Sequence, residues 1–168
     1  DRAAALARAR ELRRLFPGQP VLVEHLLPGR EFNISLLANG AVIEVLPPAE
    51  MTFVDYPGDR PRILGWEAKW DESSFAYAHT VRAFLDGREP TLRRELEAVA
   101  RAAWSACGLA GYGRVDIRLD EQGVPCVLEV NANPCISPDA GFAAAAVVAG
   151  LEPSDVVRRI LAAAGWSA

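Results

Sequence analysis

Residues 111–134 alternate between polar and apolar side chains with a period of two, which predicts a β-hairpin. The first strand has polar residues on one face, Arg114, Asp116 and Arg118, and apolar residues on the other, Val115, Ile117 and Leu119. The second strand has Val127, Glu129 and Asn131 on one face and Cys126, Leu128 and Val130 on the other. Residues 120–123 predict the turn. Opposed side chains lie roughly 4.5–5.5 Å apart at Cβ, so we expect Asp116 to face Glu129 and Asn131.

A second hairpin is predicted over residues 31–46. Its first strand alternates between outward polar residues, Glu31, Asn33 and Ser35, and inward apolar residues, Phe32, Ile34 and Leu36. Asn39-Gly40 is typical of a tight turn, because both turn positions need positive φ. Residues 51–56 are a further short strand candidate. Val21-Leu22-Val23 is expected to form a buried strand that continues as an extended segment to Pro28-Gly29.

Apolar residues recur at helical spacing in residues 2–16, 90–107 and 154–164. In the last of these helices Ser154 is the expected N-cap, and the expected core-facing residues are Val156, Val157, Ile160 and Leu161. Residues 141–149 are almost entirely apolar, so this helix is expected to be buried on all sides. A shorter helix is expected around residues 79–85, ended by Asp86-Gly87.

The composition is that of a globular protein of about one domain. The chain has 168 residues, 51% of them hydrophobic, and a formal net charge of −4. Basic residues are interleaved with acidic ones, which argues against a nucleic-acid-binding patch. There is no run of eighteen apolar residues and no visible signal peptide, so we expect no membrane span and a cytoplasmic location.

Three cysteines without metal-like spacing predict a reduced protein, in which Cys107 and Cys126 are small buried residues. The chain begins at Asp1 without a Met, so we expect it to be part of a longer protein. The oligomeric state stays open, with a homodimer among the alternatives.

The polar face of the hairpin at 111–134 indicates a cation site. Two carboxylates held this close repel each other when unpaired, which would raise a pKa. A divalent cation removes the repulsion and accepts oxygen ligands readily. Asp116, Glu129 and Asn131 are therefore the candidate ligands.

Two further segments each have two readings. Residues 24–27 follow the expected strand as an extended segment. Their backbone groups could form hydrogen bonds with the edge of an adenine, or Glu24 could be an ordinary surface residue. Lys69 stands between Trp66 and Trp70, either as a phosphate ligand with aromatic walls or as a solvated side chain. His25 is interpreted as a surface residue at the end of the strand rather than a catalytic base, because no nucleophile is spaced to it.

Four segments together resemble the C-terminal part of an ATP-grasp enzyme, in the D-alanine–D-alanine ligase-like branch. They are Val-Leu-Val-Glu-His-Leu-Leu-Pro-Gly-Arg-Glu at 21–31, Trp-Glu-Ala-Lys-Trp at 66–70, Gly-Tyr-Gly-Arg-Val-Asp at 111–116 and Leu-Glu-Val-Asn-Ala-Asn-Pro at 128–134. The resemblance covers nearly the whole chain. It implies an α+β fold, an antiparallel sheet with helices packed on one face. Residues 1–27 would end the small lobe, and residues 28–168 would form the large C-terminal lobe.

The resemblance also implies roles for single residues. Glu24 and the backbone of His25, Leu26 and Leu27 would bind the adenine of ATP. Glu31 would bind the ribose hydroxyls, and Lys69 would bind the phosphates. Mg²⁺ (or Mn²⁺) would be held by Asp116, Glu129 and Asn131, and Arg114 would stabilise the transferring phosphoryl group. The implied reaction is ATP-dependent ligation of a carboxylate to an amine through an acyl phosphate. The N-terminal half of such an enzyme would have to complete the site, so this chain alone is expected to be inactive.

The sequence departs from the D-alanine ligases just after the second strand. Cys135 stands where the family has Gly, and Ala140 where it has the Ser that receives the substrate carboxylate. D-Alanine is therefore not the expected substrate, and Cys135, Ser137 and Asp139 are candidates for binding a different group. A second interpretation makes Cys135 a buried space-filling residue.

Two other classes of function are alternatives to a ligase. A metal-dependent nuclease would need a basic face and a Lys where this chain has Asn131, so it is disfavoured. A non-catalytic module derived from the ATP-grasp fold, which binds a nucleotide or a partner, stays as the alternative.

Overall fold

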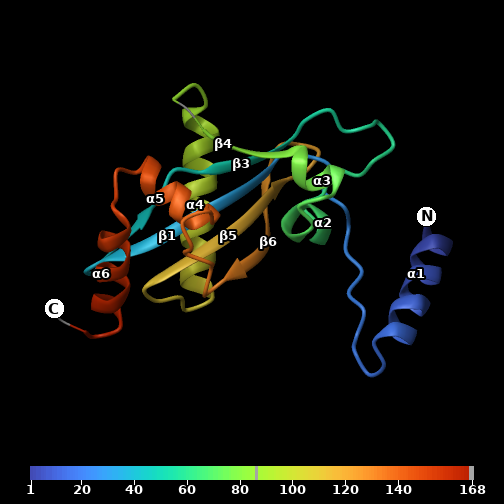
Figure 1. The fold of residues 1–168 in the computed structure, drawn as a ribbon, viewed down its shortest axis with the longest axis horizontal. Coiled ribbons are helices and arrows are strands. Elements are labelled where there is room, and N and C mark those ends of the chain that lie inside the picture. Colours follow the sequence, from blue (N-terminus) through green and yellow to red (C-terminus); the bar gives the residue numbers. More distant parts are fainter. Residues whose placement is uncertain (86, 167–168) are drawn as a thin grey trace.

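The computed structural model describes residues 1–85 and 87–166 and has the expected α+β architecture (Figure 1). A six-stranded antiparallel sheet has the order β4-β3-β1-β5-β6, with β2 paired to β1. The strands are β1 (Glu31–Asn39), β2 (Val42–Val45), β3 (Ala49–Phe53), β4 (Thr80–Phe84), β5 (Tyr112–Leu119) and β6 (Pro125–Asn131). The helices are α1 (Arg2–Leu15), α2 (Trp66–Trp70), α3 (Phe75–Ala78), α4 (Pro90–Ala106), α5 (Gly141–Val148) and α6 (Pro153–Ala163). Both predicted hairpins are confirmed.

β1 has apolar side chains on both of its faces, and different helices pack against each face. Leu36 and its neighbours on one face pack with Leu96, Ala100 and Trp104 of α4. Leu37, which follows Leu36 and so points to the opposite face, packs with residues of α5 and α6. The helices therefore lie on both faces rather than on one, but α5 and α6 reach only the Leu37 end of theirs. The remainder of that face carries polar side chains.

The hairpin of β5 and β6 contains a β-bulge that the period-two pattern did not predict. Asp116 pairs with Glu129, whereas the next residue, Ile117, pairs with Val127, so Leu128 is the extra residue. Cys126 consequently pairs with Arg118, on the face opposite to the one predicted. The bulge also places Leu128 at the surface, with 47% of its area exposed.

The predicted buried strand at 21–23 is wrong. Leu22 and Val23 are 79% and 67% exposed, and residues 20–28 have no regular structure. A strand needs a neighbour for its backbone hydrogen bonds, and none of the described strands pairs with this segment. α1 forms as predicted, but none of its residues is buried, and Figure 1 shows it set apart at the end of this extended segment.

The region of residues 73–86 also differs from the prediction. A short helix, α3, begins after Ser74, whose Oγ accepts from the Tyr77 backbone N–H. Residues 80–84 then form β4 because they pair with β3, where a helix had been expected. The predicted stop at Asp86 lies outside the described residues.

Smaller differences concern burial and capping. In α5, Val147 and Val148 are 64% and 52% exposed, so this helix is not buried on all sides. In α6, Val156 is buried, but Val157 and Leu161 are 45% and 47% exposed. Glu152, not Ser154, caps α6, because Pro153 takes the first helical position, where its missing N–H costs nothing. None of the described helices is both long and apolar enough to cross a membrane.

Candidate active site

The polar face of the sheet is formed by directly opposed residues of β1, β5 and β6. Across β1 and β5 the pairs are Glu31 with Arg118, Asn33 with Asp116, and Ser35 with Arg114. Across β5 and β6 the pairs are Asp116 with Glu129, and Arg114 with Asn131. Because opposed residues point to the same side, these eight side chains share one surface, called the polar face below. The predicted opposition of Asp116 and Glu129 is confirmed.

Arg114 holds the two predicted metal-binding carboxylates together. Its Nε and Nη2 donate to the two oxygens of Asp116 at 2.7 and 2.8 Å, and Nη2 lies 3.8 Å from Glu129 Oε1. Burial disfavours the charged guanidinium, but hydrogen bonding to Asp116 and the charges of Asp116 and Glu129 outweigh it and raise the pKa of Arg114. Arg114 is therefore a fixed positive charge beside the two carboxylates.

The donor set on β5 and β6 suits Mg²⁺. Asp116 is 4% exposed, whereas the Glu129 side chain is 53% exposed, so one carboxylate is fixed by its surroundings and the other is accessible. Asn131 Oδ1 accepts from the Asn133 backbone N–H at 2.9 Å, which orients the amide. Mg²⁺ takes one or two carboxylates and completes its shell with water and substrate phosphates, so two carboxylates and an amide oxygen fit it. The buried Nδ2 of Asn33, opposite Asp116, has no hydrogen-bond partner among the described residues.

A buried ion pair lies beside this donor set. Arg118 Nη1 donates to Glu31 Oε2 at 3.1 Å, and both side chains are more than nine-tenths buried. Arg118 also donates from Nε to the Gly29 carbonyl at 3.1 Å and from Nη2 to the Arg62 carbonyl at 2.5 Å. One side chain thus joins the 20–30 segment, β1 and the 57–65 loop.

Burial and the neighbouring charges shift the pKa of Glu31 in both directions. Burial raises its pKa, opposed by Arg118, while the charge of Asp116 raises it further. Lys69 and a backbone hydrogen bond from Leu64 lower it. Lys69 therefore lies within electrostatic reach of the polar face, although its side chain is exposed on the short helix α2.

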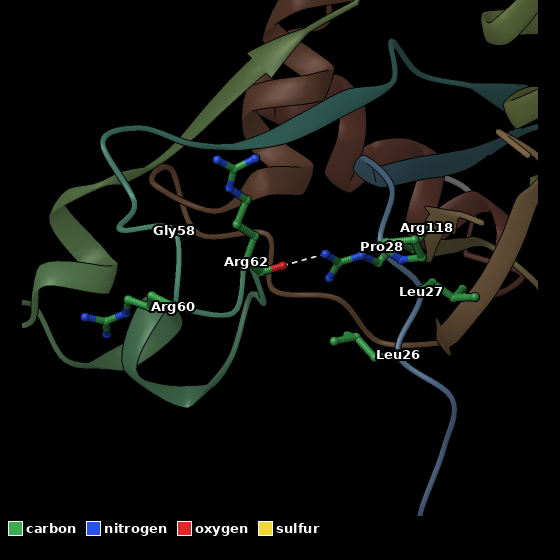
Figure 2. Close-up of a pocket in the computed structure, with 7 residues that line it drawn as sticks. All are labelled: Leu26, Leu27, Pro28, Gly58, Arg60, Arg62 and Arg118. Carbon is green, nitrogen blue, oxygen red and sulfur yellow. Dashed lines mark hydrogen bonds between the residues drawn. The ribbon is translucent and has the colours of Figure 1, made fainter. Parts of the chain in front are cut away.

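A cavity of about 360 Å³ adjoins the polar face at Arg118. Its lining residues are Leu26, Leu27, Pro28, Gly58, Arg60, Arg62 and Arg118. Figure 2 shows Arg118 at one wall of the cavity, where its hydrogen bond to the Arg62 carbonyl joins β5 to the 57–65 loop. Two of the residues predicted at the adenine, Leu26 and Leu27, thus lie at the cavity, whereas Glu24 and His25 are exposed and do not line it.

The 57–65 loop closes the opposite side of this cavity. The guanidinium of Arg60 donates to Glu67 and lies 5.1 Å from the ring centre of Phe75, so it points away from the cavity (Figure 2). The loop leads directly into α2 and Lys69. The contacts of Arg118 and Glu31 with this loop therefore also restrict where Lys69 can lie.

The three predicted substrate residues lie on the exposed loop after β6. Cys135, Ser137 and Asp139 are all exposed, so the interpretation of Cys135 as a buried space-filler is wrong. The thiol of Cys135 donates to Ser137 Oγ at 3.2 Å. Cys107 is exposed too and Cys126 is half-buried, contrary to the expectation that both are buried.

Alkylation should detect the environment of Cys135. Once ionised, the Cys135 sulfur can accept hydrogen bonds from the hydroxyl and the backbone N–H of Ser137, which lowers the pKa of the thiol against the charge of Asp139. We expect Ser137→Ala to move the alkylation profile of Cys135 to higher pH, measured by peptide mass spectrometry after timed iodoacetamide treatment. Cys107 in the same samples is the control and should keep its profile. An unchanged Cys135 profile would contradict the assignment.

The sequence prediction overlooked three residues near the site. Asn33 and Arg118 were on the correct faces of their predicted strands, and the spacing Glu31-x-Asn33 was the signal that could have found the first. Arg82 on β4 lies against the start of α5, since a Cβ added to Gly141 would be 3.5 Å from Arg82 Nη2. The position of Arg82 could not be predicted, because residues 79–85 were expected to form a helix and not a strand of the sheet.

Comparisons with known proteins agree with this geometry. A profile of the family described as "D-ala D-ala ligase C-terminus" matches residues 6–162. The chain is 34% identical over 144 residues to a D-alanine--D-alanine ligase of Nitrosococcus oceani, a match covering 84% of this chain and 40% of that protein. It is 36% identical over 143 residues to a protein of Sinorhizobium fredii named y4sG, covering 85% of this chain and 40% of that protein.

A solved structure shares the fold. The Bacillus anthracis D-alanine--D-alanine ligase complexed with ATP matches with a TM-score of 0.73 and 17% identity, over 97% of this chain and 46% of that one. The chain spans about two fifths of the length of the curated relatives it matches. The profile match extends over nearly all of the described fold, including the polar face and the loop after it. The chain therefore belongs to the D-Ala-D-Ala ligase C-terminal family of ATP-grasp ligases.

Proposed function

We propose that this chain supplies the nucleotide- and magnesium-binding face of an ATP-dependent carboxylate–amine ligase that works through an acyl phosphate. The observation that carries the proposal is the direct opposition of Asp116 and Glu129 with Arg114 beside them. The cavity at Arg118 and the segment at Leu26 and Leu27 support a nucleotide base next to that set. A relative with the same fold was solved in complex with ATP.

Each of these residues would have a separate role in phosphoryl transfer. The backbone of the 24–27 segment would receive the adenine, and Glu31, oriented by Arg118, would receive the ribose hydroxyls. Asp116, Glu129 and Asn131 would hold Mg²⁺, which neutralises phosphate charge when bound. Lys69 and Arg114 would add positive charge at the transferring group. Phosphoryl transfer relies on positioning and on electrostatic stabilisation more than on covalent help, and this set provides both.

Two displacements complete the proposed reaction. A carboxylate oxygen of the first substrate attacks the γ-phosphorus of ATP, the bond to the β-phosphate oxygen breaks, and ADP leaves. An amine of the second substrate then attacks the acyl carbon of the acyl phosphate, phosphate leaves, and the amine loses a proton. One C–N bond forms for each ATP consumed.

The loop after β6 is the proposed substrate side. Cys135, Ser137 and Asp139 are exposed there, directly after β6. We propose that residues 1–27 belong to a small lobe and residues 28–168 to the large lobe, and that parts of the protein outside this chain complete the nucleotide site. The exposed apolar side chains of Leu22 and Val23 support such an arrangement.

Isotope transfer tests the reaction. Amino acids with ¹⁸O in the carboxylate are offered with ATP, Mg²⁺ and a panel of amines to the protein carrying this chain. We expect ¹⁸O in the released phosphate, because the attacking carboxylate oxygen stays on phosphorus when the acyl carbon is attacked. Ligated product accompanied by unlabelled phosphate would contradict the acyl-phosphate route.

A further inference from the structure

The amide of Asn33 is in an unusual position for a buried polar group. The residue is 9% exposed, in the middle of β1, and its Nδ2 is the one buried side-chain nitrogen or oxygen without a hydrogen-bond partner within the described ranges. Buried donors in folded proteins are almost always paired, so an unpaired one calls for a specific reason. Its backbone is fixed on both sides by β3 and β5, so it cannot turn to solvent.

The nearest acceptor by register is the carboxylate of Asp116. Asn33 is directly opposite Asp116 on β5 and opposite Ala49 on β3, which has no polar side chain. Opposed Cβ atoms lie roughly 4.5–5.5 Å apart, a span that an amide and a carboxylate bridge with one hydrogen bond. Both Asp116 oxygens, however, already accept from Arg114. Each carboxylate oxygen can accept more than one hydrogen bond, so what leaves the amide unpaired is the direction in which the fork of Arg114 holds the Asp116 carboxylate.

Asn33 and Arg114 differ in how far they can move. Asn33 is short and buried, whereas Arg114 is a long side chain, 18% exposed, that also lies 3.8 Å from Glu129. A guanidinium attracted to a phosphate can leave Asp116 by rotating its side chain, and the amide of Asn33 stays in place. A vacated oxygen of Asp116 then has a donor already opposite it.

We propose that Asn33 is a positioning residue for the cation site. When Arg114 turns from Asp116 to the phosphates, Nδ2 of Asn33 donates to one oxygen of Asp116 and leaves the other oriented toward the cation. Hydrogen bonds to metal-binding carboxylates fix their direction and are a general feature of metal sites. The role in cation binding rests on the proposed function, whereas the competition between Asn33 and Arg114 for Asp116 does not.

A double-mutant cycle tests the competition without any ligand. Asn33→Ala should change the unfolding midpoint very little when Arg114 is present, because Nδ2 makes no bond there. With Arg114→Ala, the same change should lower the midpoint by roughly 2–4 °C, since Asn33 then bonds Asp116. If Arg114→Ala does not fold, Arg114→Lys serves, because a Lys cannot occupy both carboxylate oxygens as a fork does.

Thr52→Val is the control for the cycle. Thr52 Oγ1 donates to the Val81 carbonyl on the β3–β4 side of the sheet, so its loss should cost the same in both backgrounds. Equal effects of Asn33→Ala in the two backgrounds would overturn the inference.

Cation binding is the second measurement. In the presence of ATP, Asn33→Ala should raise the apparent dissociation constant of Mg²⁺ by roughly 10–100-fold, read from the Mg²⁺ dependence of the thermal shift. Unchanged Mg²⁺ affinity would overturn the positioning role. Coupling in the cycle together with no Mg²⁺–ATP shift in the unmodified protein that carries this chain would instead overturn the proposed function, and with it the part of Asn33 in cation binding.

Discussion

Arg118→Met is expected to destabilise the fold by about 3–5 kcal/mol, a large share of the roughly 5–15 kcal/mol that a domain has in total. The variant removes the partner of Glu31, whose side chain is only 7% exposed, and leaves its charge buried. It also frees the carbonyls of Gly29 and Arg62. Chemical denaturation of the 168-residue chain measures the loss directly.

Two further variants separate the charge effect from packing. Arg118→Met combined with Glu31→Leu should recover much of the loss, because an apolar pair of similar volume can replace a buried ion pair at little cost. Arg159→Met breaks an ion pair with Glu44 that is 21% and 38% exposed, and should cost no more than about 1 kcal/mol. A loss for Arg118→Met as small as that for Arg159→Met would contradict the buried pair.

Arg114→Ala is expected to reduce ATP-dependent ligation by a factor on the order of 10³ or more in kcat. An arginine that stabilises the transferring phosphoryl group contributes 10³–10⁵ in related chemistry. In this structure Arg114 is beside both carboxylates of the proposed cation site. Phosphate release from the protein carrying this chain, with kcat and KM for ATP determined separately, checks it.

Arg114→Lys distinguishes catalysis from folding. Lys keeps the charge beside Asp116 but lacks the planar fork that bonds two oxygens at once. We therefore expect it to retain most of the stability that Arg114→Ala loses, and to leave kcat well below that of the unmodified protein. Full turnover in Arg114→Ala would rule out a role for Arg114 in the reaction.

The polar face could be predicted because local rules decide it. Period-two alternation places Asp116 and Glu129 on one side in any register that buries Val115 and Ile117, and the structure has such a register at this end of the hairpin. Beyond Asp116 the same rule failed. The bulge at Leu128 shifts the pairing by one residue, and nothing in the alternation of β6 indicates where an extra residue enters.

Other errors have tertiary causes. Residues 80–84 join the sheet because β3 offers an edge, a contact that a helical pattern read from sequence does not include. The 21–23 segment has the composition of a buried strand, but burial requires a partner that the described residues do not provide. Glu31 was correctly placed outward, yet its pairing with Arg118, 87 residues away, depends on the alignment of two separate hairpins.

The most direct test of the central claim is where Mn²⁺–ATP binds on this chain. Mn²⁺ takes the same oxygen ligands as Mg²⁺ and broadens the NMR signals of nearby nuclei, so weak binding is still located. We predict that, at millimolar Mn²⁺–ATP, amide signals around Asp116 and Glu129 broaden first. Signals of the α4 helix around Arg101, on the opposite side of the sheet, should stay sharp. Broadening elsewhere with Asp116 and Glu129 unaffected, or no broadening at all, would contradict the claim that this face holds a metal-bound nucleotide.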